Sequence, residues 1–397
     1  MVVSLPGMCD SRKEPNNGDH DRTRESIAPT TCLLMAFELG QRSWKLGFSA
    51  GIGQRLRVRQ IPAGAIGVIA NEIVHAKARL GLALDAPVIS CYEAGREGFW
   101  LHRYLVAHGI TNHVVDSSSI EVNRRARRAK TDRLDLAGLL SLLARYVQGD
   151  RRVWRIVRVP SVTDEDARHL PRTWETLTKD RTRLINRMKG LLMTQGVRVS
   201  INKSFPAHVQ AARLWDGSPV PAGLQERLAQ DWAQLQQVER QLRERKARAA
   251  DALDRRTRTG RTIEKLQRVQ AIGVTGAWVL ATEIFGWREI ENRRQLGGLV
   301  GLVRAPYQSG DMAHDQGITR AGNHHVRRVM VQLAWGWLRY QPASALTQWY
   351  QQRFGHGGKR LRRIGIVALA RKLLIALWRY LKTGIVPDGA QLKPQEG

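Results

Sequence analysis

The feature that most constrains the fold is the order of strand-like and helix-like segments between residues 31 and 147. In some of these segments apolar residues alternate with polar ones or form a short run, which is typical of strands. In others they recur every three or four residues, which is typical of helices. Three strands in succession, followed by alternating helices and strands, predict a mixed sheet covered by helices and an α/β fold class. The predicted strands cover residues 32–38, 43–48, 56–61, 87–93 and 111–116, and the predicted helices cover 65–82, 98–108 and 131–147.

Glu38 ends the first predicted strand and Glu93 ends the fourth. Ligand sites in open α/β sheets gather at the carboxyl ends of strands. Asp132 and Asp135 begin the helix after the last strand and lie on one face of it, since they are three residues apart. The four acids together could hold a pair of Mg²⁺ ions, which take oxygen ligands and clamp both oxygens of a phosphoryl transfer. The alternative is that each acid is solvated, and that the two aspartates only complement the helix dipole.

The charge balance indicates a polyanionic partner. The 397 residues include 64 Lys and Arg against 35 Asp and Glu, which gives a formal net charge of +29. This excess favours nucleic acid over a membrane, since no apolar run of about 18 residues exists to span a bilayer. No secretory signal is recognisable and the three cysteines lack metal or disulfide spacing, so we expect a cytoplasmic protein with no membrane partner. A basic run before the aspartates is expected to bind nucleic acid: Arg124, Arg125, Arg127, Arg128 and Lys130.

The rest of the chain is predicted to be helical. Two long amphipathic segments joined by a loop-like stretch at 197–222 predict an antiparallel hairpin or coiled coil. Pro171 should kink the first of these helices or delay its start. The expected domains are a disordered segment at 1–30, the acidic domain at 31–160, a coiled-coil linker at 161–258, a helical domain at 259–385 and a disordered tail at 386–397.

Three features of the last domain are candidates for chemistry or for contacts with nucleic acid. Gly273 lies in a glycine-rich turn between two helices, where backbone N–H groups can face a phosphate, although an ordinary turn has the same composition. A helix beginning near Asn323 carries Arg327 and Arg328 in its first turns. Ser309 precedes a glycine in a turn-rich loop, and it is either a nucleophile activated by the surrounding positive charge or only a turn residue.

Two enzyme classes are disfavoured by the motifs. No GxxxxGK[ST] sequence occurs, so nothing predicts the phosphate-binding loop of an NTPase. Residues 47–51 match the G-x-S-x-G pattern of a nucleophile elbow, which requires a strand, a sharp turn and a helix. The next segment, residues 57–61, alternates like a strand, so we predict that Ser49 lies in a hairpin.

Taken in chain order, these features resemble the DEDD-type insertion-sequence transposases with a C-terminal catalytic serine, which are bridge-RNA-guided recombinases. The resemblance covers about residues 33–385, and the ordered set of motifs is specific although each motif alone is weak. The motifs are Glu38, Tyr92-Glu93-Ala94, Lys130-Thr131-Asp132-Arg133-Leu134-Asp135, Ala271-Ile272-Gly273, Gln308-Ser309-Gly310 and Gly322-Asn323 with Val326-Arg327-Arg328.

The resemblance implies an RNase H-like (RuvC-like) mixed-sheet domain, a coiled-coil middle and a helical C-terminal transposase domain. It implies that Glu93, Asp132 and Asp135 bind Mg²⁺, and that Ser309 forms a covalent link to a DNA phosphate. It also implies a bacterial, nucleoid-associated homo-oligomer, a dimer or tetramer, and a structured guide RNA that pairs with donor and target DNA. The family's first acid is usually Asp, so Glu38 displaces that carboxylate by one methylene and bears on the activity of this copy.

Three functions fit the sequence. The first is an RNA-guided DNA recombinase that moves an insertion sequence. The second is a resolvase-like, structure-specific endonuclease that hydrolyses DNA with metal-activated water and needs no serine. The third is a non-catalytic, defective copy that only binds DNA through its positive charge.

Overall fold

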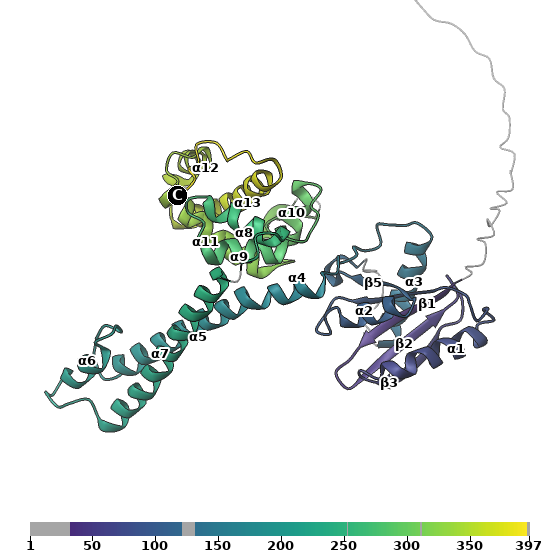
Figure 1. The fold of residues 1–397 in the computed structure, drawn as a ribbon, viewed down its shortest axis with the longest axis horizontal. Helices are drawn as coiled ribbons and strands as arrows, with labels where there is room; N and C mark the ends of the chain where they lie inside the picture. Colours follow the sequence, from purple (N-terminus) through teal and green to yellow (C-terminus); the bar gives the residue numbers. More distant parts are fainter. Residues whose placement is uncertain (1–31, 121–131, 252, 310–311, 395–397) are drawn as a thin grey trace, which may run out of the picture. The chain divides into compact units, whose positions relative to one another are not determined.

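The chain divides after Val157 into two compact units (Figure 1). The structure is a computed structural model that describes residues 32–120, 132–251, 253–309 and 312–394. The expected disorder of residues 1–30 and the basic run Arg124–Lys130 both lie outside the described residues. No helix in the described ranges is long and apolar enough to cross a membrane.

The first unit is built on a five-stranded mixed sheet. Its strands lie in the order β3-β2-β1-β4-β5, with β1 antiparallel to β2 and parallel to β4. This confirms the predicted fold class, and every predicted strand is present. The strands are β1 (Leu33–Leu39), β2 (Ser43–Ser49), β3 (Arg57–Pro62), β4 (Val88–Glu93) and β5 (Thr111–Val115).

Both faces of the sheet are buried by apolar side chains. On one face, Leu34, Ala36 and Cys91 join the buried leucines of α3 in a single cluster. On the other face the alternate residues Met35 and Phe37 are buried as well. The helices of this unit are η1 (Ile66–Val68), α1 (Ile69–Arg79), α2 (Trp100–Ala107), η2 (Ser117–Ser119) and α3 (Asp132–Val147).

The G-x-S-x-G sequence forms a hairpin, as predicted. Ser49 ends β2, which pairs antiparallel with β3, and its Oγ donates a hydrogen bond of 2.9 Å to the carbonyl oxygen of Gly51. No helix follows the turn, so the sequence does not build a nucleophile elbow.

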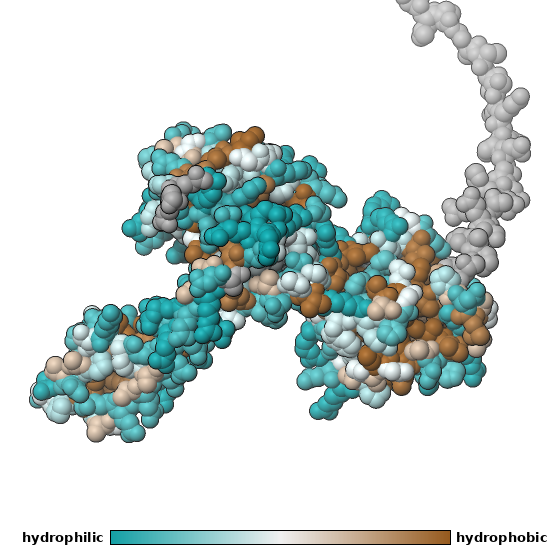
Figure 2. Space-filling model, viewed as in Figure 1, coloured by the Kyte–Doolittle hydropathy of each residue, from teal (hydrophilic) through white to brown (hydrophobic). Residues whose placement is uncertain are grey.

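The second unit begins with an antiparallel helix pair, α5 (His169–Met193) and α7 (Ala222–Asp251). Ion pairs Arg181–Glu239 and Arg187–Asp231 join the two helices, and hydrophilic residues cover most of the visible face of the pair (Figure 2).

The preceding helix α4 (Val162–Ala167) has Arg168 as its C-cap, so Pro171 falls in the first turn of α5. A proline is tolerated there because the first turn has no carbonyl partners for its N–H groups. The delayed helix start is thereby confirmed.

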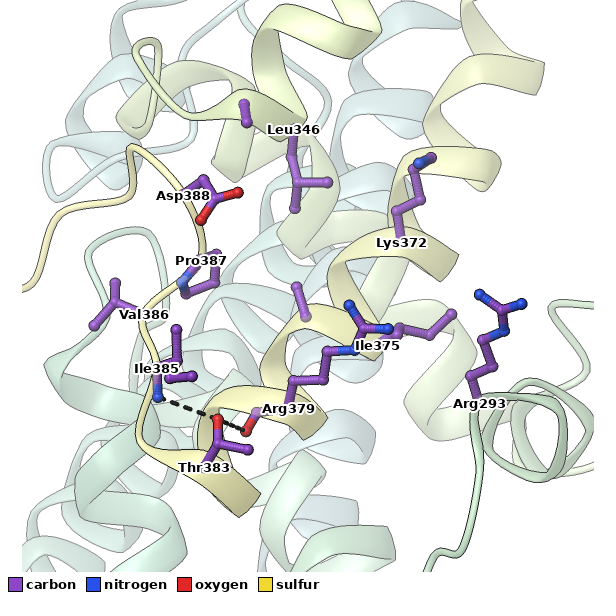
Figure 3. Close-up of a pocket in the computed structure, with 12 residues that line it drawn as sticks. Arg293, Leu346, Lys372, Ile375, Arg379, Thr383, Ile385, Val386, Pro387 and Asp388 are labelled. Carbon is purple, nitrogen blue, oxygen red and sulfur yellow. Dashed lines mark hydrogen bonds between the residues drawn. The ribbon is translucent and has the colours of Figure 1, made fainter.

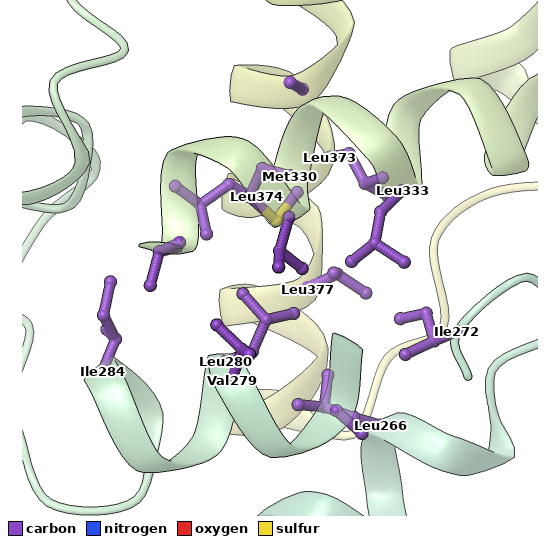
Figure 4. Packing of buried hydrophobic residues seen from close by; sticks show 14 of the residues in the cluster. Leu266, Ile272, Val279, Leu280, Ile284, Met330, Leu333, Leu373, Leu374 and Leu377 are labelled. Carbon is purple, nitrogen blue, oxygen red and sulfur yellow. The ribbon is translucent and has the colours of Figure 1, made fainter. Parts of the chain in front are cut away.

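Much of the rest of this unit packs around α13 (Lys359–Thr383). Leu373, Leu374 and Leu377 of α13 are fully buried against Leu280 and Met330 (Figure 4). The other elements are α6 (Phe205–Ala211), α8 (Arg258–Arg268), α9 (Val274–Leu280), the π-helical turn η3 (Ala281–Phe285), α10 (Arg293–Val300), β6 (Arg304–Ser309), β7 (Met312–Ile318), α11 (His324–Tyr340), α12 (Ala345–Tyr350) and the π-helical turn η4 (Gln351–Gly355).

Three predictions about this unit are wrong. The stretch 197–222 is not all loop, because it contains α6. The turn-rich loop around Ser309 is instead the antiparallel hairpin β6–β7. Residues 386–394 of the expected disordered tail are ordered, because Leu392 pairs with Val269 and the Gln391 carbonyl oxygen accepts a hydrogen bond of 2.9 Å from Gln341.

Candidate active site

Glu38 and Glu93 lie next to each other at the carboxyl ends of two parallel strands. In the β1–β4 register Ala36 pairs with Cys91 and Phe37 with Tyr92, so the two glutamates come one residue after the last pair. Side chains two residues apart point to the same face of a sheet. Ala36 and Cys91 both face α3, and the two glutamates therefore do so too. Neighbouring strands are about 4.8 Å apart, which is close enough for both carboxylates to contact one cation.

The environment of Cys91 agrees with this placement. Burial raises the pKa of the Cys91 thiol, and the negative charge of Glu93 raises it further. The effect of Glu93 on this thiol is consistent with the two side chains sharing one face of the sheet. Glu93 itself is exposed, whereas Glu38 is half-buried.

Helix α3 packs on the face of the sheet formed by β1, β2 and β4. Leu136 and Leu140 pack on the sheet at Gly47, where an added Cβ would lie 3.0 Å from Leu140 Cδ1. The glycine therefore permits close approach of the helix. Asp132 is the first residue of α3, and Asp135 is half-buried next to Leu136. The side chain of Asp132 is outside the described part of the structure.

The oxygen atoms of these carboxylates are suitable ligands for a divalent cation, although the described side chains do not include all four candidate acids. Glu38 and Glu93 supply carboxylate oxygens, which hard cations such as Mg²⁺ prefer. Among the described side chains, which exclude that of Asp132, no three of His, Cys, Asp and Glu gather closely enough to hold a metal ion. The four-carboxylate cluster therefore stays a prediction.

Ser309 is the last residue of β6 and pairs with Met312 at the start of β7. Only Gly310 and Asp311 separate the two strands, and they lie outside the described residues together with the Ser309 side chain. The backbone thus places the candidate nucleophile at the end of β6 that pairs with the start of β7. Its predicted chemistry stays a prediction.

The second unit contains two buried acids near the start of α11. Glu283, in η3, is 1% exposed, and Arg172 donates to both of its carboxylate oxygens at 2.7 and 3.1 Å. The side-chain amide of Asn323 donates a further hydrogen bond of 2.7 Å to it. Burial alone would raise the pKa of Glu283, but the hydrogen bonds and charge of Arg172, aided by Asn323, lower it on balance.

Glu175 on α5 is held in a similar way. Its carboxylate lies 2.6 Å from His325 Nδ1, 2.8 Å from Lys179 Nζ and 3.1 Å from Arg328 Nη2. Burial would raise the pKa of Glu175, but hydrogen bonds from Lys179 and His325 and the charge of Arg328 outweigh burial and lower it to about 2. Both buried acids therefore stay ionised and join α11 to the rest of the unit.

Two family models and a long relative match this chain. The model described as "Transposase IS116/IS110/IS902 family" matches residues 263–350, and the IS110-type DEDD model, described as "Transposase", matches residues 53–195. A Sinorhizobium fredii protein named "Putative transposase y4rJ" is 37% identical over 375 residues, covering 91% of this chain and 94% of its own length. A second S. fredii protein, "Putative transposase y4qE", is 35% identical over 80 residues, or 20% of each chain.

The chain belongs to the transposase IS116/IS110/IS902 family. Membership of this transposase family implies a DNA-cleaving and recombining type of enzyme with DNA as its partner. Its five-stranded mixed sheet is the expected RNase H-like DEDD domain, a type of domain that generally uses a divalent metal. The DEDD match includes Glu93, Asp132 and Asp135 but begins after Glu38, and the other match includes Ser309.

The predicted nucleic-acid contacts of the transposase fall into two groups. Gly273 precedes α9, and the space around its Cα is open. Asn323, by contrast, caps α11 by accepting from the N–H of Val326, Arg327 donates to the Val300 carbonyl oxygen at 2.8 Å, and Arg328 pairs with Glu175. These internal contacts do not test nucleic-acid binding, which stays a prediction for all four residues.

Sequence reasoning missed several charged residues around these sites. Lys45 lies directly opposite Glu38 in the β1–β2 pair, which places an ammonium group beside a candidate metal ligand. Hairpin register was the signal that could have revealed it. Glu175 and Glu283 gave no such signal, because their partners are distant in sequence.

Proposed function

We propose that this transposase cuts and rejoins the DNA of an insertion element, with Mg²⁺ held by Glu38, Glu93, Asp132 and Asp135 and with Ser309 as the nucleophile. The observation that carries the proposal is the pairing of Glu38 and Glu93 at adjacent strand ends, on the sheet face that α3 covers. When bound, Mg²⁺ would neutralise charge on the phosphate and polarise its oxygens.

The serine step conserves the phosphodiester bond energy. The Ser309 hydroxyl oxygen forms a bond to phosphorus while the bond from phosphorus to one sugar oxygen breaks. The proton of the serine passes to the departing sugar oxygen, which leaves as a hydroxyl group. Reversal of the step by another DNA hydroxyl rejoins the strand and needs no nucleotide cofactor. Gly310 and Asp311 follow the serine directly, so substrate would approach it at a hairpin turn.

We further propose that an element-encoded structured RNA selects donor and target DNA, and that the protein acts as a dimer or tetramer. The net charge of +29 supports binding of two polyanions at once. Arg124, Arg125, Arg127, Arg128 and Lys130 would contact their backbones beside the acids, and Gly273, Asn323, Arg327 and Arg328 would do so in the second unit. The resemblance of the ordered motifs supports RNA guidance.

A denaturing-gel assay for protein–DNA adducts tests the proposal. Full-length protein would be incubated with Mg²⁺, element-junction DNA and RNA transcribed from the non-coding end of the element. We expect an adduct that Ser309→Ala and Asp132→Ala both abolish. Ser200→Ala is the matched control, because Ser200 is exposed and outside every candidate site. An adduct that persists in Ser309→Ala would exclude this serine as the nucleophile.

A resolvase-like nuclease is the second candidate function. It is favoured by one observation: all four candidate acids lie in the first unit, while Ser309 belongs to the second. Hydrolysis by metal-activated water would need only the acids. In the same assay, Mg²⁺-dependent nicking that survives Ser309→Ala and disappears in Asp132→Ala would favour this function over the first.

A further inference from the structure

A cavity of about 580 Å³ lies along α13 in the second unit (Figure 3). It is closed on one side by α13 and on another by the segment that leads from Thr383 to Asp388. Leu346, Ile375 and Val386 give it apolar walls. Its volume lies within the range of about 300–1,000 Å³ that is typical of small-molecule sites.

Three cations line the cavity, and none of them pairs with an acid among the residues that the structure describes. Arg293, Lys372 and Arg379 form no ion pair within the described part of the chain, and the Lys372 ammonium lies 4.6 Å from the ring centroid of Trp349. This contrasts with Arg172 and Arg328, whose charges are matched by buried glutamates. An anionic ligand would therefore meet donors that the fold itself does not use.

One acid, Asp388, lies on the opposite side of the cavity from these cations (Figure 3). Its backbone oxygen accepts from the N–H of Ala345, but its carboxylate forms no hydrogen bond or ion pair with any described residue. The cavity thus combines cations, an apolar wall and a single acceptor. A nucleotide has a group for each of these features: its phosphate can bind the cations, the face of its base can contact the apolar wall, and an amino group on the edge of the base can donate to the acceptor.

The surrounding surface supports nucleic acid over a small metabolite. Helix α13 carries eight lysines and arginines and no acidic residue. A nucleic acid bound along this helix would lie next to the opening of the cavity, and one of its nucleotides could enter the cavity. A paired and stacked base cannot enter such a cavity, so the strand must be single or locally opened.

We propose that this cavity binds one unpaired nucleotide of the DNA, with its phosphate at Arg379, Lys372 and Arg293, its base against Ile375 and Leu346, and its edge at Asp388. Cytosine suits the site, because its N4 amino group donates to a carboxylate. The inference rests on DNA being the substrate of the proposed function, and it adds to that function a subsite for single strands.

The test measures binding of fluorescein-labelled (dC)12, (dT)12 and a 12-base-pair duplex by fluorescence anisotropy over a range of salt concentrations. We expect Arg379→Gln to weaken (dC)12 binding and to reduce the slope of log affinity against log salt by about 0.7, the value for one phosphate contact on a single strand. Arg245→Gln is the charge-matched control, since Arg245 is exposed on α7 and has no acidic partner among the described residues.

Ala376→Phe tests the cavity itself, because Ala376 lines it and the new ring would fill it without changing charge. We expect this variant to bind (dC)12 about fivefold or more weakly, with an unchanged salt slope and unchanged duplex binding. Asp388→Asn should remove the preference for (dC)12 over (dT)12. Thermal unfolding would verify that each variant is folded.

Equal effects of Arg379→Gln and Arg245→Gln, or a folded Ala376→Phe protein with normal (dC)12 affinity, would overturn the proposal. Tighter binding of (rC)12, with greater sensitivity to Ala376→Phe, would assign the cavity to RNA and overturn the assignment to DNA. These readouts need no strand cleavage. The binding measurements can therefore be interpreted even if Ser309 forms no adduct with DNA. A negative result in the binding measurements would in turn not change the interpretation of the adduct assay.

Discussion

The two units of this transposase use carboxylates in opposite ways. In the first unit Glu93 is exposed and Glu38 half-buried, side by side where two parallel strands end. In the second unit Glu283 and Glu175 are buried, and arginine, lysine, histidine or asparagine donors surround them. An acid whose charge is matched inside the fold stabilises that fold, whereas an acid at a strand end is accessible to a ligand. The degree of burial therefore separates these structural acids from the candidate catalytic acids.

The largest effect is expected at the strand ends. Glu93→Gln replaces a candidate metal-binding oxygen by an amide and should slow cleavage of element-junction DNA by about a hundredfold or more. The free energy of unfolding should change by less than about 0.5 kcal/mol, because the side chain is exposed. Initial cleavage rates and urea unfolding measure the two effects. Glu97→Gln, four residues later, is the control, and an equal loss of rate there would argue against a special role for Glu93.

A buried acid should show the reverse pattern. Glu283→Ala leaves Arg172 and Asn323 without their partner and should lower the free energy of unfolding by about 2–4 kcal/mol in urea. Glu289 is the matched control, because it also pairs with an arginine but is exposed, so Glu289→Ala should cost much less. Similar costs for the two variants would contradict the distinction between the two classes of acid.

Acid should weaken the second unit through Glu175. The pKa of this group is lowered from 4.5 to about 2, so its contribution is fully present above about pH 4.5 and is lost as the pH falls through about 2. The full contribution is about 3 kcal/mol by linkage. Urea unfolding at several pH values should show that the difference between the native protein and Glu175→Gln shrinks towards pH 2. A difference that does not depend on pH would exclude this role.

The smallest effect is expected for Glu38→Asp. The resemblance of the sequence implies that aspartate is the usual residue at the first acidic position, so the cleavage rate should be unchanged or higher. The same assay on Glu38→Ala provides the reference for complete loss of the carboxylate. A clear loss of rate in Glu38→Asp would mean that Glu38 is not the first acid of the cluster.

Local sequence patterns were sufficient to predict the first unit. Alternation and helical spacing are properties of neighbouring residues, and they predicted all five strands and the three main helices of the sheet domain. The carboxyl-end rule then predicted that Glu38 and Glu93 would meet, and the β1–β4 register agrees with it.

Patterns of this kind failed where distant segments decide the structure. Glu175 and His325 are 150 residues apart, so nothing near either residue predicts their contact. Strand β6 was mistaken for a loop because Pro306 and Gly310 are typical of turns, yet a two-stranded hairpin tolerates proline since both strands are edges. The segment at 386–394 has little sequence pattern of its own and is ordered by hydrogen bonds to Gln341 and Gln270.

Gly47 has a consequence for how copies of such an element should be judged. Its missing side chain lets Leu136 and Leu140 of α3 lie close to the sheet, and α3 is the helix that carries Asp132 and Asp135. A valine there, an ordinary residue for a strand, would push the helix away from the sheet and shift both aspartates, while all four acidic residues would remain in the sequence. An intact set of acidic motifs is therefore an insufficient criterion for a mobile element that still works.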